Sequence, residues 1–198
     1  VNLSNEQIIF ATTAKDIGLK NPEGYYFNHI IANTDGTLFL TTLNKECVGK
    51  RFCVPVIIWP YEKQIKIYDT IKFPSHPQFV SKDEIIYFSS DGYVKHDLRN
   101  DVKVMLLKTN KDGHPTYTHT GDTFNIITDT YPDRFSRFSC YEFCSESGFS
   151  EIMSVRNPPI YRGAVRCDLH PRVINSNSLT IDCPTKSGRE IFLLEKKL

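Results

Sequence analysis

The hydrophobic residues of this chain fall in short runs that are rich in β-branched and aromatic side chains and are separated by turn residues. Runs of about four to eight such residues are typical of β-strands, and we find no convincing pattern of an amphipathic helix. Turn dipeptides such as Asp35-Gly36, Asp91-Gly92 and Asp112-Gly113 separate several of the runs. The pattern predicts an all-β chain built from hairpins, with strands at residues 7–11, 38–43, 54–59, 64–68, 84–89, 102–107, 124–128, 179–181 and 190–194.

These runs belong to an internal repeat that is marked by histidine. His29, His76, His114 and His170 each begin a unit of a short strand, a polar turn and a stronger strand. The four histidines lie 47, 38 and 56 residues apart, and a four-stranded β-propeller blade comprises about 40 to 50 residues. We therefore expect a β-propeller of about four blades, at residues 25–73, 74–110, 111–160 and 166–198.

The length of the chain leaves two forms of propeller open. About four blades either close into a small ring, with residues 7–11 as the closing strand, or form part of a ring of seven or eight blades. Because the first residue is not Met, we expect a processed chain or a fragment, which a second copy or a partner chain completes. A β-sandwich is the alternative, since repeating hairpins also produce regular strand spacing.

Composition excludes several classes of function. The 24 Lys and Arg residues nearly balance the 23 Asp and Glu residues, which argues against a nucleic-acid partner. The longest uncharged apolar run, Cys53 to Pro60, is too short to span a bilayer. The six cysteines form no CxxC pair, so we expect reduced structural thiols, as in a cytoplasmic protein. The motifs of esterases, phosphate-binding loops and zincins are absent from the sequence.

The repeat histidines are the first candidates for chemistry. Because they occupy the same blade position, we expect their imidazoles to converge at one end of the channel, where they suit a transition metal or proton transfer. The alternative is that each one bonds the backbone of the neighbouring blade and holds the blades in register. His96 and His119 are expected on the solvated surface.

The segment from Arg166 to Arg172 contains two guanidinium groups, a carboxylate and an imidazole. On a strand, Arg166, Asp168, His170 and Arg172 would share one face, and Cys167 would face the core. An arginine fork can bind a substrate carboxylate, while Asp168 can orient His170 or bind a metal. A salt-bridge network between blades is the alternative.

Two loops supply further candidates. Tyr131 follows a strong strand, and a tyrosine close to arginines such as Arg134 can act as a base when its pKa is lowered. It can equally pack on Pro132. In the second loop, Tyr161 and Arg162 either bind a sugar ring or cover the end of the propeller.

The pattern His-Pro-x-aromatic, a turn and an apolar strand resembles the repeat of TolB-like propellers and of oligogalacturonate-lyase-type propellers. The densest matching segments are 112–115, 128–133 and 166–172. The sequence departs from the lyase pattern because it lacks a compact cluster of several His and a Gln in one segment, and its turns have diverged from Ser-Pro-Asp-Gly.

The resemblance implies a carbohydrate-acting propeller that cleaves uronate-containing polysaccharide by β-elimination. In that scheme Tyr131 or His114 removes a proton, Arg166 and Arg172 neutralise the uronate carboxylate, and Tyr161, Arg162 and Arg134 bind the saccharide. A divalent metal (Zn, Mn or Ca) is expected on a set of five residues: His29, His76, His114, Asp168 and His170. A lyase would be periplasmic or secreted. The alternative function is a non-catalytic scaffold or glycan-binding propeller of bacterial surface-polysaccharide metabolism.

Overall fold

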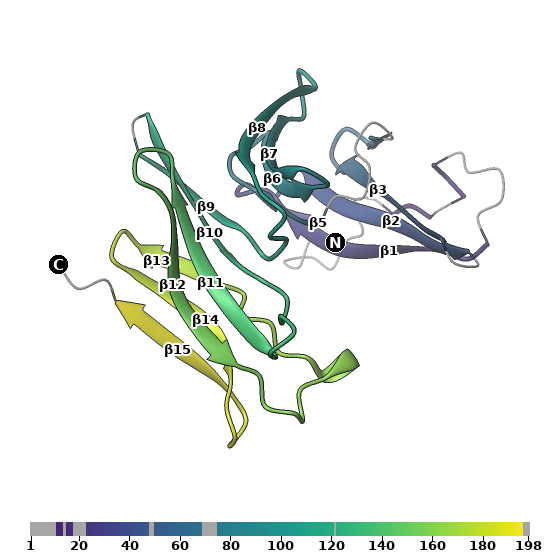
Figure 1. Cartoon of the computed structure of the whole chain (residues 1–198). Coiled ribbons are helices and arrows are strands. Elements are labelled where there is room, and N and C mark those ends of the chain that lie inside the picture. The colour runs from purple at the N-terminus through teal and green to yellow at the C-terminus, as the bar shows by residue number, and fades with distance from the viewer. Residues whose placement is uncertain are drawn as a thin grey trace, which may run out of the picture. The chain divides into compact units, whose positions relative to one another are not determined.

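Antiparallel strands are almost the only regular secondary structure in the computed structural model, which describes residues 11–13, 15–17, 23–47, 50–68, 75–120 and 122–195 (Figure 1). In these ranges the one helical segment is a 3-10 turn, η1 (Gly163–Val165). Among the described residues, no helix has the length and apolar character needed to cross a membrane.

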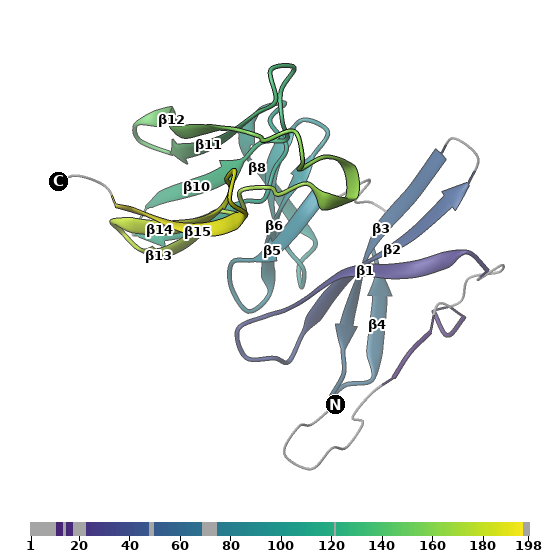
Figure 2. The same ribbon diagram turned by 90° about the horizontal axis from the view of Figure 1, so that it is seen from below.

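The strands form four sheets in which consecutive strands are neighbours (Figures 1 and 2). The first sheet contains β1 (Tyr25–Ala32), β2 (Phe39–Cys47), β3 (Lys50–Trp59) and β4 (Gln64–Ile67). The second contains β5 (Ser75–Phe79), β6 (Glu84–Ser89), β7 (Gly92–Asp97) and β8 (Val102–Lys108). The third contains β9 (Thr116–Thr120), β10 (Thr123–Asp129), β11 (Arg137–Cys144) and β12 (Gly148–Arg156). The fourth has three strands, β13 (Arg172–Asn175), β14 (Ser178–Pro184) and β15 (Arg189–Glu195).

Small antiparallel sheets with this strand order are the blades of a β-propeller, so the predicted fold class is confirmed. Four separate sheets do not fit the alternative of a β-sandwich, which has two packed sheets. In the predicted closing strand 7–11, residues 7–10 lie outside the described residues. The single domain and the number of blades in the complete ring stay predictions.

The chain divides into two compact units, residues 1–90 with 94–106 and residues 91–93 with 107–198. In the first unit the core includes Leu40, Ile57, Ile85 and Leu98. The second unit has a separate core between its two sheets, to which β10, β11 and β14 contribute. The second core consists of Ile127, Phe138, Cys140, Leu169, Leu179 and Ile181.

The histidine repeat has a counterpart in the backbone. His29, His76 and His170 have positive φ angles of 53°, 46° and 41°, a conformation that is uncommon for non-glycine residues. The strand register shifts between Asn28 and Ile31 and between Ser75 and Gln78, so the first two histidines lie in β-bulges. The repeat therefore marks a recurring backbone feature in or just before the first strand of a sheet.

The structure contains strands that the sequence did not predict, namely β7, β11 and β12. In β11 (RFSCYEFC) and β12 (GFSEIMSVR), polar residues interrupt the runs of apolar residues. The sequences of these strands therefore lack the hydrophobic pattern that predicts a strand. Cys140, Cys144, Cys167 and Cys183 are free thiols, and three of the four are buried, which agrees with the expected reduced structural thiols.

The expectation that His96 lies on the surface is wrong. Its side chain is fully buried on β7, where its ring lies edge-on to those of Tyr68 and Tyr87 at 5.4 and 6.4 Å. Nε2 lies 2.7 Å from a carboxylate oxygen of Asp101. Burial lowers the pKa of His96, and the hydrogen bond to Asp101 only partly opposes this effect.

Because the folded state lowers the pKa of His96, the unfolded chain binds a proton more readily. The stability that depends on neutral His96 is present above the unfolded pKa of about 6.5 and is lost as pH falls through it. The unaltered protein should unfold at a lower urea concentration as the pH falls from about 7.5 to about 5.5. We expect this decrease in the urea midpoint to be smaller in His96→Leu. The exposed His119 supplies the control, because His119→Ala should leave this pH dependence unchanged. An unaltered pH dependence in His96→Leu would contradict the assignment.

Candidate metal centre

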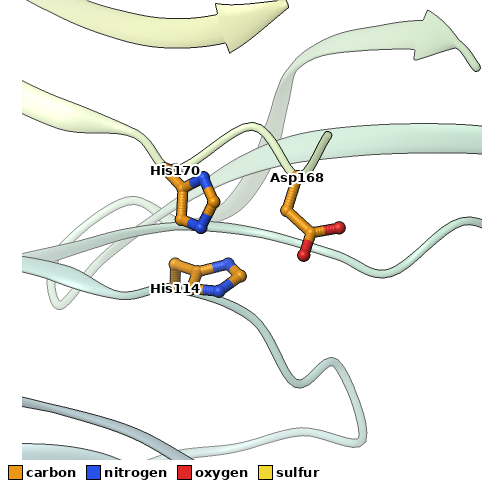
Figure 3. Close-up of side chains that lie close together, drawn as sticks. All are labelled: His114, Asp168 and His170. Carbon is orange, nitrogen blue, oxygen red and sulfur yellow. The ribbon is translucent and has the colours of Figure 1, made fainter. Parts of the chain in front are cut away.

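Three of the predicted metal ligands, His114, Asp168 and His170, come together in the second unit (Figure 3). His114 precedes β9, while Asp168 and His170 lie between η1 and β13. One potential ligand atom from each residue lies within 4.8 Å of the others. The two imidazole centroids are 4.0 Å apart, and Figure 3 shows the Asp168 carboxylate beside the pair. The group has the composition of a site for a divalent metal.

Each imidazole of this group contacts a carboxylate through Nδ1. His114 Nδ1 lies 3.0 Å from both carboxylate oxygens of Asp129, at the end of β10. His170 Nδ1 lies 3.1 Å from Oδ2 of Asp182, on β14. A carboxylate that accepts a hydrogen bond from Nδ1–H leaves the lone pair on Nε2, and metal-binding histidines commonly have such a partner. In this tautomer, Nε2 is the nitrogen of each ring that has the lone pair of a metal ligand.

Asp129 joins the two segments that supply the ligands. Its carboxylate accepts backbone hydrogen bonds from His114 N–H at 2.7 Å and from His170 N–H at 2.9 Å. The residue is 1% exposed. Burial alone would raise the pKa of Asp129, but the hydrogen bonds from His114 and His170 and the electrostatic effect of His114 outweigh it and lower the pKa. A buried carboxylate therefore stays ionised and holds both segments in place.

The close approach of these segments requires a glycine at position 113. A Cβ atom on Gly113 would lie 1.8 Å from the backbone oxygen of Asp129. No rotamer change can relieve this contact, because the opposing atom belongs to the backbone. Gly113 thus allows the segment before β9 to lie against the end of β10.

The two arginines of the 166–172 segment pair with carboxylates of the chain itself. Arg166 donates two hydrogen bonds to Asp168, at 2.5 and 2.7 Å. Arg172 donates two to Asp182, at 2.9 and 3.0 Å. A fork of this kind occupies one lone pair on each oxygen, so the Asp168 carboxylate retains acceptor capacity.

The sequence predicts a strand at residues 166–172 with Arg166, Asp168, His170 and Arg172 on one face, and this expectation is wrong. Residues 166–171 lie outside the strands, and β13 begins at Arg172. Cys167, Asp168 and Leu169 are nevertheless buried, at 5%, 8% and 0% exposure, whereas Arg166 and His170 are more accessible. Cys167 is buried in the protein, as predicted. Anchoring by alternate apolar residues thus takes the place of strand pairing.

A cavity of about 230 Å³ adjoins the metal centre. Sequence reasoning missed four of its lining residues, among them Arg189, at the start of β15. Arg189 Nη2 donates to the backbone oxygens of Val165 and Arg166 at 2.6 and 3.4 Å. Its position just after the Ser187-Gly188 turn is the only signal in the sequence. The full lining is Arg166, Cys167, Asp168, His170, Asp182, Arg189, Glu190 and Ile191.

Tyr131 lies close to His114, and its phenol is the protonated form, which donates hydrogen bonds. The guanidinium of Arg166 lies 4.5 Å from the centroid of its ring, and the centroid of the His114 ring is 6.4 Å away. Burial raises the pKa of Tyr131, and the nearby Arg166 does not reverse this effect. A neutral phenol suits hydrogen-bond donation better than the predicted role as a base.

The other predicted site residues are not part of the lining of the 230 Å³ cavity, although the Tyr161 ring lies 5.7 Å from the guanidinium of Arg189. Tyr161 is only 8% exposed, which fits the alternative that its loop covers the structure. Arg162 and Arg134 are exposed and are not part of the cavity lining. His29 and His76 belong to the first unit, where their ring centroids are 5.9 Å apart.

No protein-family model matches the sequence, and no curated protein sequence matches it. Among solved structures, acylaminoacyl peptidase of Pyrococcus horikoshii is similar, with 11% identity and a TM-score of 0.57 over 88% of this chain. The matched region is 31% of the peptidase, so this chain spans about a third of its length. The β-propeller domain of the Trilobed protease of Pyrococcus furiosus matches 89% of this chain, with 12% identity, a TM-score of 0.52 and 56% of that chain covered.

These two likenesses support the propeller fold and nothing about activity, because the identities are so low. An oligogalacturonate lyase in complex with manganese also matches, with 7% identity and a TM-score of 0.46, over 89% of this chain and 67% of the lyase. A TM-score of this size supports no inference about this chain.

We expect Gly113→Ala to lower the free energy of unfolding by more than about 2 kcal/mol, because the added Cβ displaces the buried Asp129 segment. Gly148→Ala is the matched control in the same unit. Gly148 has a φ of 85° and no atom within 4 Å of an added Cβ. Gly148→Ala should therefore lower the free energy of unfolding by only about 1 kcal/mol, the cost of a Cβ at positive φ. Urea unfolding measures both values. Equal costs would contradict the close approach at Gly113.

Proposed function

We propose that this propeller binds a divalent transition metal through His114, Asp168 and His170 and uses the site to bind an acidic saccharide. The observation that carries the proposal is the pairing of each imidazole Nδ1 with its own carboxylate. This pairing fixes the tautomer and the ring orientation before a metal arrives, which raises affinity.

The donor set favours some ions over others. Two imidazole nitrogens and one carboxylate suit Zn²⁺ or Mn²⁺. Ca²⁺ takes about six to eight oxygen ligands, so it is the least suitable of the three ions expected from the sequence. A bound ion would supply positive charge and Lewis acidity for an anionic group of the substrate.

The chain's own residues suit a carboxylate-bearing substrate beside this centre. The 230 Å³ cavity adjoins Asp168 and His170 and has Arg189 in its wall. Arg166 and Arg172 were expected to neutralise the uronate carboxylate, but each is already paired with an aspartate. We therefore assign the role of binding the carboxylate to Arg189, whose Nη2 is held by backbone oxygens of the 165–166 segment.

A lyase reaction at this site would be β-elimination. A base removes the proton from the carbon next to the uronate carboxylate. A double bond forms between this carbon and its neighbour, and the bond from that neighbour to the leaving oxygen breaks. Tyr131 has a raised pKa, so it suits donation of a proton to that leaving oxygen. His114 can be the base only where its Nε2 is not a metal ligand, so metal binding and His114 catalysis are alternatives.

One observation favours a second candidate function, a non-catalytic glycan-binding or scaffold propeller. Asp129 accepts backbone N–H bonds from both His114 and His170. These bonds connect the segments that precede the two blades of the second unit. In this case the histidines stabilise the fold and need no metal.

Titration calorimetry with Zn²⁺ and Mn²⁺ tests the metal site. We expect His114→Ala and His170→Ala to abolish stoichiometric binding, and Asp182→Asn to weaken it by about 10 to 100-fold through loss of ring orientation. His119→Ala, which removes an exposed histidine of the same unit, should bind as the unaltered protein does. If the unaltered protein binds neither ion, the metal proposal fails and the scaffold is favoured.

A second assay tests the substrate class. The whole chain, with and without Zn²⁺ or Mn²⁺, is incubated with pectic, alginate-like and ulvan-like polymers while the ultraviolet absorbance of unsaturated product is followed. We expect a metal-dependent rise, or saturable binding of uronate oligomers, that Arg189→Gln reduces by about tenfold because a charge-assisted bond is lost. If neither product nor binding is seen with any of these polymers, the acidic-saccharide proposal is rejected.

A further inference from the structure

A second cavity, of about 450 Å³, lies between the two sheets of the second unit. Residues of β9, β10 and β11 line one side of it, and residues of β13 and β14 line the other. We call it the inter-sheet pocket. Its lining shares no residue with the metal centre or the 230 Å³ cavity, and its size falls within the range of about 300 to 1,000 Å³ that is typical of ligand sites.

The strand register places the polar residues of this pocket on one face of the third sheet. Asn125 on β10 pairs with Thr118 on β9, and Ile127, two residues along β10, pairs with Glu142 on β11. Alternate residues of a strand share a face, so Asn125 and Ile127 face the same side. Ile127 belongs to the core between the two sheets, which shows that this side faces the fourth sheet.

Sheet faces that pack against another sheet ordinarily carry apolar side chains. Here the apolar core ends at Ile127. Beyond it, the same face of the third sheet carries the polar side chains of Thr118, Asn125 and Glu142. Polar groups in such positions cost stability unless they are hydrogen-bonded, and departures of this kind concentrate at functional sites.

One polar atom of the lining, the side-chain oxygen of Asn125, lacks a hydrogen-bond donor within the described residues. This oxygen is buried. A buried amide oxygen without a donor costs about 1 to 3 kcal/mol. A ligand hydroxyl that reached this oxygen would recover that free energy.

The chemistry of the lining defines the ligand class. The Asn125 oxygen and the Glu142 carboxylate accept hydrogen bonds, and the hydroxyls of Ser176 and Ser178 can both donate and accept. The lining contains no Lys, Arg or His, so nothing in it would compensate an anionic ligand. Leu179 and Val173 supply apolar surface for the C–H face of a ring. From these features we infer that the inter-sheet pocket binds an uncharged polyhydroxylated ligand, namely a neutral sugar unit.

This inference does not depend on the proposed metal centre, because the two sites have no lining residue in common. The test uses the whole chain and a panel of neutral sugars, comprising glucose, galactose, xylose, arabinose and their β-linked disaccharides, with galacturonate as the anionic comparison. Binding is followed by chemical-shift changes of backbone amides. We expect at least one neutral sugar to shift amides of β9, β10 and β13 saturably, and galacturonate to leave them unshifted.

Asn125→Ala separates binding from folding. Because it removes an unpaired buried oxygen, it should leave the urea midpoint unchanged or raised. It should also weaken binding of the sugar by about tenfold, the value of one lost hydrogen bond. Asn177→Ala, at a turn residue of the same unit outside the lining, should bind normally. Zn²⁺ binding should be the same in both variants.

Three results would overturn the inference: no neutral sugar shifts these amides, galacturonate shifts them equally, or Asn125→Ala binds the sugar as the unaltered protein does. None of these results bears on the metal centre, whose failure would appear only in the calorimetric titration.

Discussion

The carboxylate of Asp129 is the constraint on which the geometry of the second unit depends. It accepts the backbone N–H groups of His114 and His170 and the Nδ1–H group of His114. Removal of one partner from such a buried, charged network typically costs about 3 to 5 kcal/mol. The 4.0 Å separation of the two imidazoles and the need for glycine at position 113 both follow from how close these bonds bring the two segments.

The candidate metal centre lies where the core of the second unit meets irregular backbone. Leu169, which separates Asp168 from His170, is fully buried among Ile127, Phe138 and other core residues. Along β14, Ile181 and Cys183 face this core, so Asp182 between them faces the other side, where it contacts His170. Core packing thus orients two acidic residues and one histidine without a strand at residues 166–171. The same core ends at the inter-sheet pocket, where Asn125 takes the position of an apolar residue.

The blade organisation could be predicted from the sequence, because the histidine repeat coincides with a recurring backbone feature that has positive φ at His29, His76 and His170. Proximity of Asp168 to His170 could also be predicted, since only Leu169 separates them. The partners of the imidazoles could not, because Asp129 and Asp182 lie 15 and 12 residues from His114 and His170, and only the hairpin register brings them together. Arg189 was missed for the same reason. His96 was misplaced because one histidine on a short alternating strand carries no sign of burial.

The central claim is that two carboxylates hold His114 and His170 as Nε2 ligands. Long-range ¹H–¹⁵N correlation of the histidine side chains in the metal-free protein tests it most directly. The account predicts that both rings carry the proton on Nδ1, and that Zn²⁺ then shifts Nε2 of both residues while the Nδ1–H signals persist. Protonation on Nε2 in either ring, or a Zn²⁺-induced loss of the Nδ1–H signals, would contradict it.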